Sequence, residues 1–325
     1  SASAQKVTYI TFVVPGTNGT LPTSINAEGM VAGYYFDTGT TYHSFVRARD
    51  GTIATFDPPG AVVSIAVSIN HAGTVTGYYS DTTAQHGFLR ARDGTIETFD
   101  PPGADFTQPN SINVWGAITG YYSDTSGMLH GFLRAGDGTF TTFDPLGSIF
   151  TYPASINSAG AITGQYEDAS FIVHGFLRAS DGTITSFDAP GGCEFTAPTS
   201  INAPGAITGS CDGLHGFLRN TDGTFATFDP PGSTETMPAS INSAGVITGF
   251  WTHTGHFGVA HGFVRASNGV IGEFDVPGSI ETSPTAINPT GIITGGYAGV
   301  SVGGGFLRIP HDNDEGENQQ GGEDR

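Results

Sequence analysis

The chain is poor in positive charge. Its 325 residues contain 11 Lys and Arg against 30 Asp and Glu, a formal net charge of -19, and Lys6 is the only lysine. Surfaces that bind nucleic acid or anionic membranes need clusters of Lys and Arg that displace counterions. We therefore expect no nucleic-acid partner.

Long apolar runs and helical periodicity are also missing. No apolar run reaches the length of about 18 residues that a bilayer crossing requires, so we expect no membrane span. Charged residues make up only 13% of the chain, whereas glycine is abundant, with 49 residues. Such a composition is typical of short strands joined by turns. Helices are therefore not expected.

What the sequence does contain is a repeat. The motif F-D-x-P-G recurs at intervals in the forties, preceded by a degenerate T-F-V-V-P-G copy at Phe12. A period of this length with strand-like content indicates a β-propeller with one blade per repeat. The phenylalanines of the full motif are Phe56, Phe99, Phe143, Phe187, Phe228 and Phe274.

Each repeat predicts four antiparallel strands. The dipeptide Asp93-Gly94 predicts a two-residue hairpin turn between the third and fourth strands of the second repeat. Counting outward from that turn places Phe88 opposite Phe99, and the same count pairs the equivalent phenylalanines of the other repeats. We expect these pairs to stabilise the blades.

The chain ends predict how the last blade is completed. The last repeat has no fourth strand, whereas residues 7–12 read as a fourth strand with no preceding three. We therefore predict an all-β fold, a seven-bladed β-propeller of four-stranded antiparallel blades whose last blade is closed by the N-terminal strand. The propeller is expected to cover residues 7–309.

The two ends are expected to lie outside the propeller. Residues 1–6 open with the small-x-small pattern of a signal-peptidase site, which predicts a leader remnant, with residues added for expression as the alternative. Residues 310–325 are rich in acidic and polar side chains, which predicts a disordered, solvated tail.

A histidine begins the third strand in six repeats. One histidine per blade puts neighbours roughly 10 Å or more apart, too far to share a zinc ion, so we expect neither a metal site nor a cofactor. The histidines are His43, His86, His130, His174, His215 and His261. Their expected partners are the acids of the preceding loops, namely Asp37, Asp81, Asp124, Asp168 and Asp212.

Two further polar positions recur. The Asp of each F-D motif is expected to accept hydrogen bonds from the amides of the following Pro-Gly turn. An Asn ends the first strand of every repeat, as at Asn70, and we expect it to serve the next turn, with a polar ring lining the axial channel as the alternative. An Arg in every repeat, as at Arg90, is expected to belong to the scaffold.

The two cysteines, Cys193 and Cys211, fall in the same repeat. We expect a disulfide and not two reactive thiols, provided that their Cα atoms come within about 7 Å. Disulfides persist in oxidising compartments. We therefore expect a secreted protein, extracellular or periplasmic.

The repeated units S-I-N-x-x-G-x-I-T-G-Y-Y and H-G-F-L-R-x-x-D-G-T resemble the HAF-repeat family of extracellular repeat proteins, named for a His-Ala-Phe tripeptide. The resemblance covers residues 7–309. Most repeats have Gly at the middle position of the tripeptide, where the first has Ser44 and the seventh reads Gly-Gly-Phe. The resemblance implies secretion and a repeat architecture, and it implies no catalytic residues.

Function is expected where the repeats differ. The sixth repeat has the longest insertion before its third strand, W-T-H-T-G-H-F-G-V-A-H, and an indole beside two extra histidines could bind a sugar ring. The alternative is a loop that packs its Trp on a neighbour. The predicted ligand-binding residues are Trp251, His253, His256, Tyr297, Glu235 and Glu281.

These observations predict a binding or interaction module for carbohydrate or a cell-surface component, and we expect a monomer. One alternative is a polysaccharide-degrading enzyme, a lyase or a hydrolase, with His253 or His256 as base and Tyr297 as acid. A second alternative is a structural extracellular repeat protein. The motifs of serine hydrolases, zinc proteases and phosphate loops are absent.

Overall fold

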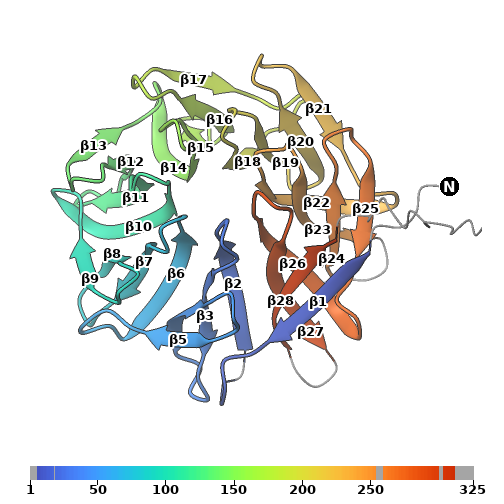
Figure 1. The fold of residues 1–325 in the computed structure, drawn as a ribbon. Helices are drawn as coiled ribbons and strands as arrows, with labels where there is room; N and C mark the ends of the chain where they lie inside the picture. Colours follow the sequence, from blue (N-terminus) through green and yellow to red (C-terminus); the bar gives the residue numbers. More distant parts are fainter. Residues whose placement is uncertain (1–5, 18, 254–258, 300–302, 312–325) are drawn as a thin grey trace, which may run out of the picture.

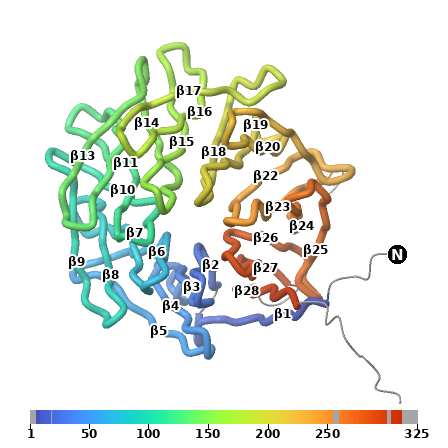
Figure 2. The backbone as a smooth tube through the Cα atoms, turned by 45° about the horizontal axis from the view of Figure 1, so that its top comes forward, coloured from blue at the N-terminus to red at the C-terminus, as the bar shows by residue number. Residues whose placement is uncertain are grey.

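The computed structural model describes residues 6–17, 19–253, 259–299 and 303–311. In that part of the chain the regular elements are all β-strands, from β1 to β28, and there is no helix. The strands follow one another in groups around a central opening (Figure 1). The tilted view confirms that each group runs outward from that opening (Figure 2).

Most sheets have four antiparallel strands. The first contains β2 (Gly19–Ile25), β3 (Val31–Phe36), β4 (Tyr42–Arg47) and β5 (Ile53–Phe56). A twelve-stranded sheet follows, with β6 (Val63–Ile69), β7 (Val75–Ser80), β8 (Gln85–Arg90), β9 (Ile96–Phe99), β10 (Ala104–Ile112), β11 (Ile118–Asp124), β12 (Leu129–Arg134), β13 (Phe140–Phe143), β14 (Ser148–Ile156), β15 (Ile162–Asp168), β16 (Val173–Arg178) and β17 (Ile184–Phe187). The next two are β18 (Thr196–Ile201), β19 (Ile207–Cys211), β20 (His215–Arg219) and β21 (Phe225–Phe228), then β22 (Ser233–Ile241), β23 (Ile247–His253), β24 (His261–Arg265) and β25 (Ile271–Phe274).

The last sheet joins the two ends of the chain. It contains β26 (Ser279–Ile287), β27 (Ile293–Gly299), β28 (Gly303–Pro310) and, at its edge, β1 (Val7–Phe12). β1 runs antiparallel to β28, as the orphan N-terminal strand predicts. β28 extends one residue beyond the predicted end of the propeller.

The predicted pairing of Phe88 with Phe99 is wrong by one residue. Phe99 lies opposite Gly87, and Phe88 lies opposite Thr98. The turn closes through a 3.0 Å bond from the Gly94 amide to the Ala91 carbonyl, and Gly94 has a φ of 96°. This geometry adds a bulge residue to the turn, which shifts the register of the hairpin by one position.

The phenylalanines instead pack between sheets. Phe56 in β5 meets Phe88 in β8 edge to face, with ring centroids 5.8 Å apart, and the Arg90 guanidinium lies 4.7 Å from the centre of the Phe56 ring. Equivalent cation–π contacts recur for the other repeat arginines, which confirms their predicted scaffold role. The third-strand phenylalanines are fully buried, at Phe45, Phe88, Phe132, Phe176, Phe217, Phe263 and Phe306.

The repeated asparagines form a cyclic chain of hydrogen bonds. Each side-chain amide donates to the backbone carbonyl of the next asparagine, and the Asn288 amide donates back to Asn26 at 3.1 Å. The side-chain oxygens accept from turn amides, as when Asn113 accepts from Ala117 at 3.0 Å. The two predicted roles, turn and ring, are therefore combined. The asparagines and their neighbours line an axial cavity of about 280 Å³.

The repeated histidines bind two acids each in most repeats, but not in the predicted order. Nδ1 of His86 lies 2.7 Å from Asp100 of the F-D motif, whereas Nε2 lies 3.6 Å from the predicted partner Asp81. Asp100 also accepts from the Thr107 hydroxyl of the neighbouring strands at 2.5 Å, and not from turn amides as expected. The F-D acid therefore links one group of four strands to the next, because its second oxygen faces the first strand of the following group.

The fifth repeat departs from this arrangement. His215 contacts Asp229 at 2.7 Å, but the predicted partner Asp212 accepts from the Phe195 amide at 2.8 Å. Asp212 has a φ of 53°, in the left-handed region, and its amide donates to the Phe195 carbonyl at 2.8 Å.

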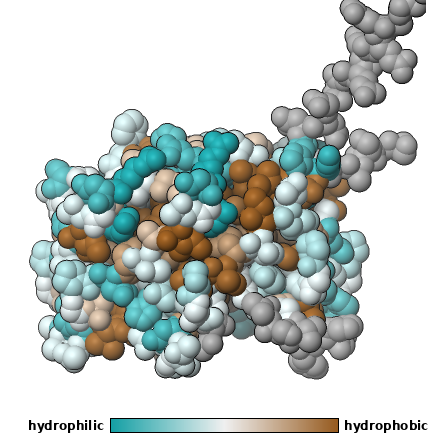
Figure 3. All heavy atoms as spheres, turned by 60° about the horizontal axis from the view of Figure 1, so that its bottom comes forward, coloured by the Kyte–Doolittle hydropathy of each residue, from teal (hydrophilic) through white to brown (hydrophobic). Residues whose placement is uncertain are grey.

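The outer wall is chemically mixed. Hydrophobic residues form separate patches between polar ones on the side that Figure 3 shows. Within the described part of the chain there is no helix with the length and hydropathy needed to cross a membrane.

Candidate ligand-binding rim

Trp251 does not present its indole to solvent. It lies in β23 with 6% of its surface exposed, and its ring centroid is 5.3 Å from those of both His253 and His261. Its indole nitrogen is buried and has no hydrogen-bond partner among the described residues. Trp251 occupies the place of the second tyrosine in T-G-Y-Y, so the sixth repeat packs a tryptophan where other repeats pack that tyrosine.

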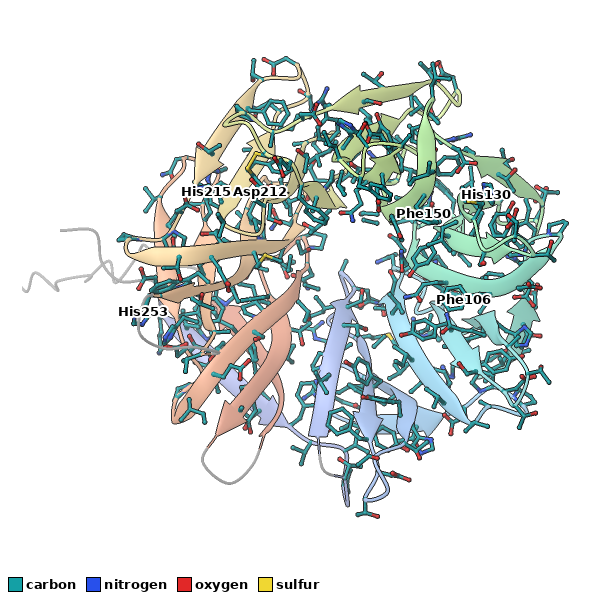
Figure 4. All side chains as sticks on the ribbon, turned by 180° about the vertical axis from the view of Figure 1, so that it is seen from behind. Phe106, His130, Phe150, Asp212, His215 and His253 are labelled. Carbon is teal, nitrogen blue, oxygen red and sulfur yellow. A yellow bond between two sulfur atoms is a disulfide. The ribbon has the colours of Figure 1, made fainter. Side chains whose placement is uncertain are left out.

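The other predicted ligand-binding residues near the sixth repeat do not form one site. His253 ends β23 and stacks on His261 at 5.3 Å, whereas His256 lies outside the described residues. Glu235 accepts from the Thr252 hydroxyl at 3.1 Å. Figure 4 places His253 across the central opening from Phe106 and Phe150. Neither His253 nor Glu235 lines the cavity that contains the remaining two candidates.

Tyr297 and Glu281 do come together. Both line a cavity of about 250 Å³ between the first sheet and the last, which we call the seam pocket. Leu21 and Phe36 give it apolar walls, and Ser283 and Gly296 complete the side formed by β26 and β27. The pocket therefore combines an apolar surface with one carboxyl and one phenol.

A missing side chain creates the seam pocket. Gly296 stands where the first three repeats have Tyr34, Tyr78 and Tyr121. A Cβ added at Gly296 would meet nothing nearer than Leu21 Cδ2, at 4.0 Å. The space that a tyrosine fills between other sheets is thus left open here.

Five tyrosines continue from the seam pocket along the same rim. Leu21, which lines the pocket, lies opposite Tyr34 in the register of β2 and β3. The Tyr34 ring is 5.6 Å from Tyr42, and Tyr121 is 5.3 Å from Tyr152. We call the set the tyrosine arc; it consists of Tyr34, Tyr42, Tyr78, Tyr121 and Tyr152.

The hydroxyl groups of the arc have no hydrogen-bond partner among the residues that the structure describes. Burial raises the pKa of Tyr34, Tyr78, Tyr121 and Tyr152. Other tyrosines of the arc raise the pKa of the first three further, and Glu167 does so for Tyr152. Phe106 stacks on Tyr121 with centroids 6.0 Å apart, which adds a further ring to the surface. The arc can thus offer hydroxyl groups and ring faces to a ligand.

The sequence contained a signal for this surface that the prediction missed. In T-G-Y-Y the second aromatic becomes Cys211 in the fifth repeat and Trp251 in the sixth, but it stays buried. The first tyrosine of the motif is replaced in the fourth to seventh repeats by Gln165, Ser210, Phe250 and Gly296. Variation at the first position alone separates a tyrosine-rich half of the rim from a half with smaller or different side chains.

The predicted disulfide is present on this rim. Cys193 and Cys211 are joined, with Cα atoms 5.6 Å apart. Asp212 also lies near the two sulfurs. The bond holds the segment before β18 against the end of β19.

Comparison with known proteins supports the fold. No family model matches the chain, and no curated protein is similar to it. Among solved structures, it is similar to a streptogramin B lyase, with 16% identity over 94% of this chain and 98% of that one, and a TM-score of 0.61. It is also similar to an inactive variant of virginiamycin B lyase from Staphylococcus aureus bound to quinupristin. The identity is 17% over 95% of this chain and 100% of that one, and the TM-score is 0.64.

A third similar structure is the β-propeller domain of the trilobed protease from Pyrococcus furiosus. The identity is 9% over 91% of this chain and 99% of that one, and the TM-score is 0.63. At this level of identity the likeness concerns the fold alone. The chain is therefore a β-propeller.

Proposed function

We propose that the protein is a secreted seven-bladed β-propeller that binds carbohydrate on the rim formed by the seam pocket and the tyrosine arc. The blade count is supported by the twelve-stranded sheet, whose groups of four strands are joined only by single parallel pairs such as Phe106 with Gln85. Closure by the N-terminal strand is supported by the pairing of β1 with β28. Contact between the last sheet and the first is supported by the bond from the Thr285 hydroxyl to the Pro22 carbonyl, at 3.0 Å.

The proposed location and family rest on separate features. The disulfide between Cys193 and Cys211 favours an oxidising compartment, extracellular or periplasmic. The repeated His-Gly-Phe tripeptides favour membership of the HAF-repeat family.

The observation that carries the proposed ligand class is the set of five tyrosine hydroxyls without partners among the described residues. Sugar rings present apolar C–H faces beside hydroxyl groups, so a tyrosine can stack on one and bond to the other. A pocket of about 250 Å³ suits a single ring better than a drug-sized molecule. The net charge of -19 disfavours polyanionic ligands.

The test is a binding titration with neutral oligosaccharides of different composition. Tyr121→Phe removes one hydroxyl and keeps the ring, so we expect affinity to fall about 2- to 10-fold, the range of one hydrogen bond. The matched control is Tyr122→Phe, which removes the hydroxyl of the buried neighbour and should leave affinity unchanged. Equal effects of the two variants, or no saturable binding, would contradict the proposal.

A polysaccharide lyase or hydrolase is the second candidate, because Glu281 and Tyr297 share the seam pocket. It predicts small products when neutral or uronic-acid polymers are incubated with the protein and followed by mass spectrometry. Glu281→Gln or Tyr297→Phe should then stop product formation without abolishing binding. Neither binding nor products, together with self-association, would support the structural alternative.

A further inference from the structure

A further cavity lies on the opposite rim. It has a volume of about 730 Å³ and is lined from the β2–β3 and β4–β5 turns of the first sheet and from the β6–β7 and β8–β9 turns of the next strands. The seam pocket lies at the other ends of β2 and β3. The two sites are therefore separate.

This cavity collects the arginines that the repeat does not explain. Seven arginines recur at one position of every repeat and stack on phenylalanines of the neighbouring strands. Apart from the C-terminal Arg325, the two others are Arg49 and Arg92, and both line the cavity. The later repeats have Gly136, Ser180 or other uncharged residues at the same place. The cavity is thus a local positive feature in an acidic protein.

The acidic side chains that line the cavity leave the Arg49 guanidinium available for a ligand. Asp50 accepts from the Thr52 amide at 2.9 Å within its own turn. Glu28 is 3.2 Å from Arg92, but the two side chains are 40% and 61% exposed, so the pair is weak. Arg49 has no hydrogen bond or ion pair with any residue in the described ranges.

Apolar and aromatic-bound groups complete the cavity. Met30, Val46 and Ala54 supply apolar walls. Arg90 also lines it, and its guanidinium is held over Phe56 at 4.7 Å. A volume of this size accommodates an organic molecule and not only an inorganic ion.

We infer that this cavity binds a small organic anion. Its carboxylate, phosphate or sulfate group would bind Arg49 and Arg92, displacing Glu28 from Arg92, and its apolar part would cover Met30, Val46 and Ala54. Planar guanidinium groups suit such oxyanions because they can donate two parallel hydrogen bonds.

The experiment uses probes that share one apolar ring. Benzoate, phenyl phosphate and phenyl sulfate are titrated into the whole protein by calorimetry, with benzamide as the neutral probe. We expect the anions to bind at least tenfold more tightly than benzamide, and Arg49→Ala and Arg92→Ala to weaken anion binding about tenfold each. The preference among the three anions identifies the oxyanion. Lys6→Ala, which removes a positive charge elsewhere, is the control and should have no effect.

Glu28→Gln provides a test that does not depend on loss of function. It frees Arg92 from its carboxylate, so anion binding should tighten by about threefold. Equal binding of benzamide and benzoate, unchanged binding in the arginine variants, or weaker binding in Glu28→Gln would each overturn the inference.

Discussion

Tyr121 and Tyr122 are adjacent in the chain and serve opposite faces of one strand. Tyr122 has 8% of its surface exposed, and its ring lies 5.4 Å from that of His130 within the same group of strands. Tyr121 is half-buried, contacts Phe106 and Tyr152, and has no hydrogen bond from its hydroxyl to a described residue. Successive side chains of a strand point to opposite faces, so one dipeptide supplies both scaffold and surface.

The difference explains how the repeats diverge. The second position packs against a repeated histidine, and every repeat retains a buried or half-buried side chain there. A side chain at the first position packs against other side chains of the rim and not against the repeated histidine, so its replacement leaves the histidine packing intact. A repeat protein can therefore vary one half of its rim without changing its blades.

The largest predicted effect is a loss of stability from a substitution at Gly120, which would disturb the strand that holds both Tyr121 and Tyr122. A Cβ on Gly120, the residue before the dipeptide, would lie 2.0 Å from the Gln108 carbonyl oxygen. Because backbone cannot yield as a side chain can, we expect Gly120→Ala to lower the free energy of unfolding by about 3 kcal/mol in urea titrations. Gly296→Ala is the control and should change it by less than about 0.5 kcal/mol. Similar losses in both variants would contradict this explanation.

The second prediction concerns a substitution that gives the last repeat the tyrosine found at the same position in the first three repeats. Gly296→Tyr gives the last repeat the tyrosine that the first three have, and its ring should fill the seam pocket. We expect saccharide affinity to fall about tenfold, roughly 1.4 kcal/mol, with little change in stability. Calorimetry and urea unfolding measure the two quantities. Unchanged or tighter binding would show that the ligand does not occupy this pocket.

The third prediction separates the two tyrosine positions by stability. The Tyr166 hydroxyl donates to Ser186 at 3.0 Å, so Tyr166→Phe should lower the free energy of unfolding by about 1 kcal/mol. Tyr121→Phe removes a hydroxyl without such a partner and should be neutral. A loss in Tyr121→Phe as large as that in Tyr166→Phe would mean that the arc hydroxyl has a structural role.

The smallest predicted effect is the pH dependence of stability that His130 and His174 contribute. Their rings pack against Tyr122 and Tyr166. Burial lowers the pKa of His130 and His174, but hydrogen bonds and charge from their Asp partners outweigh it and raise the pKa overall. The resulting stabilisation is complete below the unfolded pKa of about 6.5 and is lost as pH rises through the folded value. We expect less than about 1 kcal/mol per site, because the pairs are partly exposed.

Urea unfolding at pH 6 and pH 8 measures this loss. The double variant His130→Gln/His174→Gln should show a smaller difference between the two pH values. At the acidic end, hydrogen bonds hold the pKa of Asp81 and Asp124 at about 2, below the ordinary 3.8. Their contribution is present above pH 3.8 and is lost as pH falls toward 2. An unchanged pH difference in the double variant would exclude the two histidines as its cause.

Several predictions from the sequence hold because they depend on local patterns. The strand order follows from the turn residues of each repeat, and the pairing of the N-terminal strand follows from the missing fourth strand of the last repeat. The disulfide was predicted because both cysteines fall in one repeat, and their Cα atoms meet the distance condition. The prediction for Trp251 treated an unusual residue as a surface feature. Comparison of T-G-F-W with T-G-Y-Y places it instead at a packing position, since both strands have the same register.

The sequence by itself determined the β-propeller class, the period and the four strands of each repeat, because these depend on the repeated motif and on turn residues close together in the chain. Only the tertiary structure decided the hairpin register, where one bulge residue moves Phe99 from Phe88 to Gly87. It also decided that the F-D acids bind the first strand of the following group and that Gly296 opens a pocket beside the tyrosines. The register depends on the shape of one turn, and the F-D bonds depend on how one group of strands meets the next. The seam pocket joins residues from opposite ends of the chain, such as Leu21 and Gly296. A count of residue spacings within one repeat specifies none of these contacts.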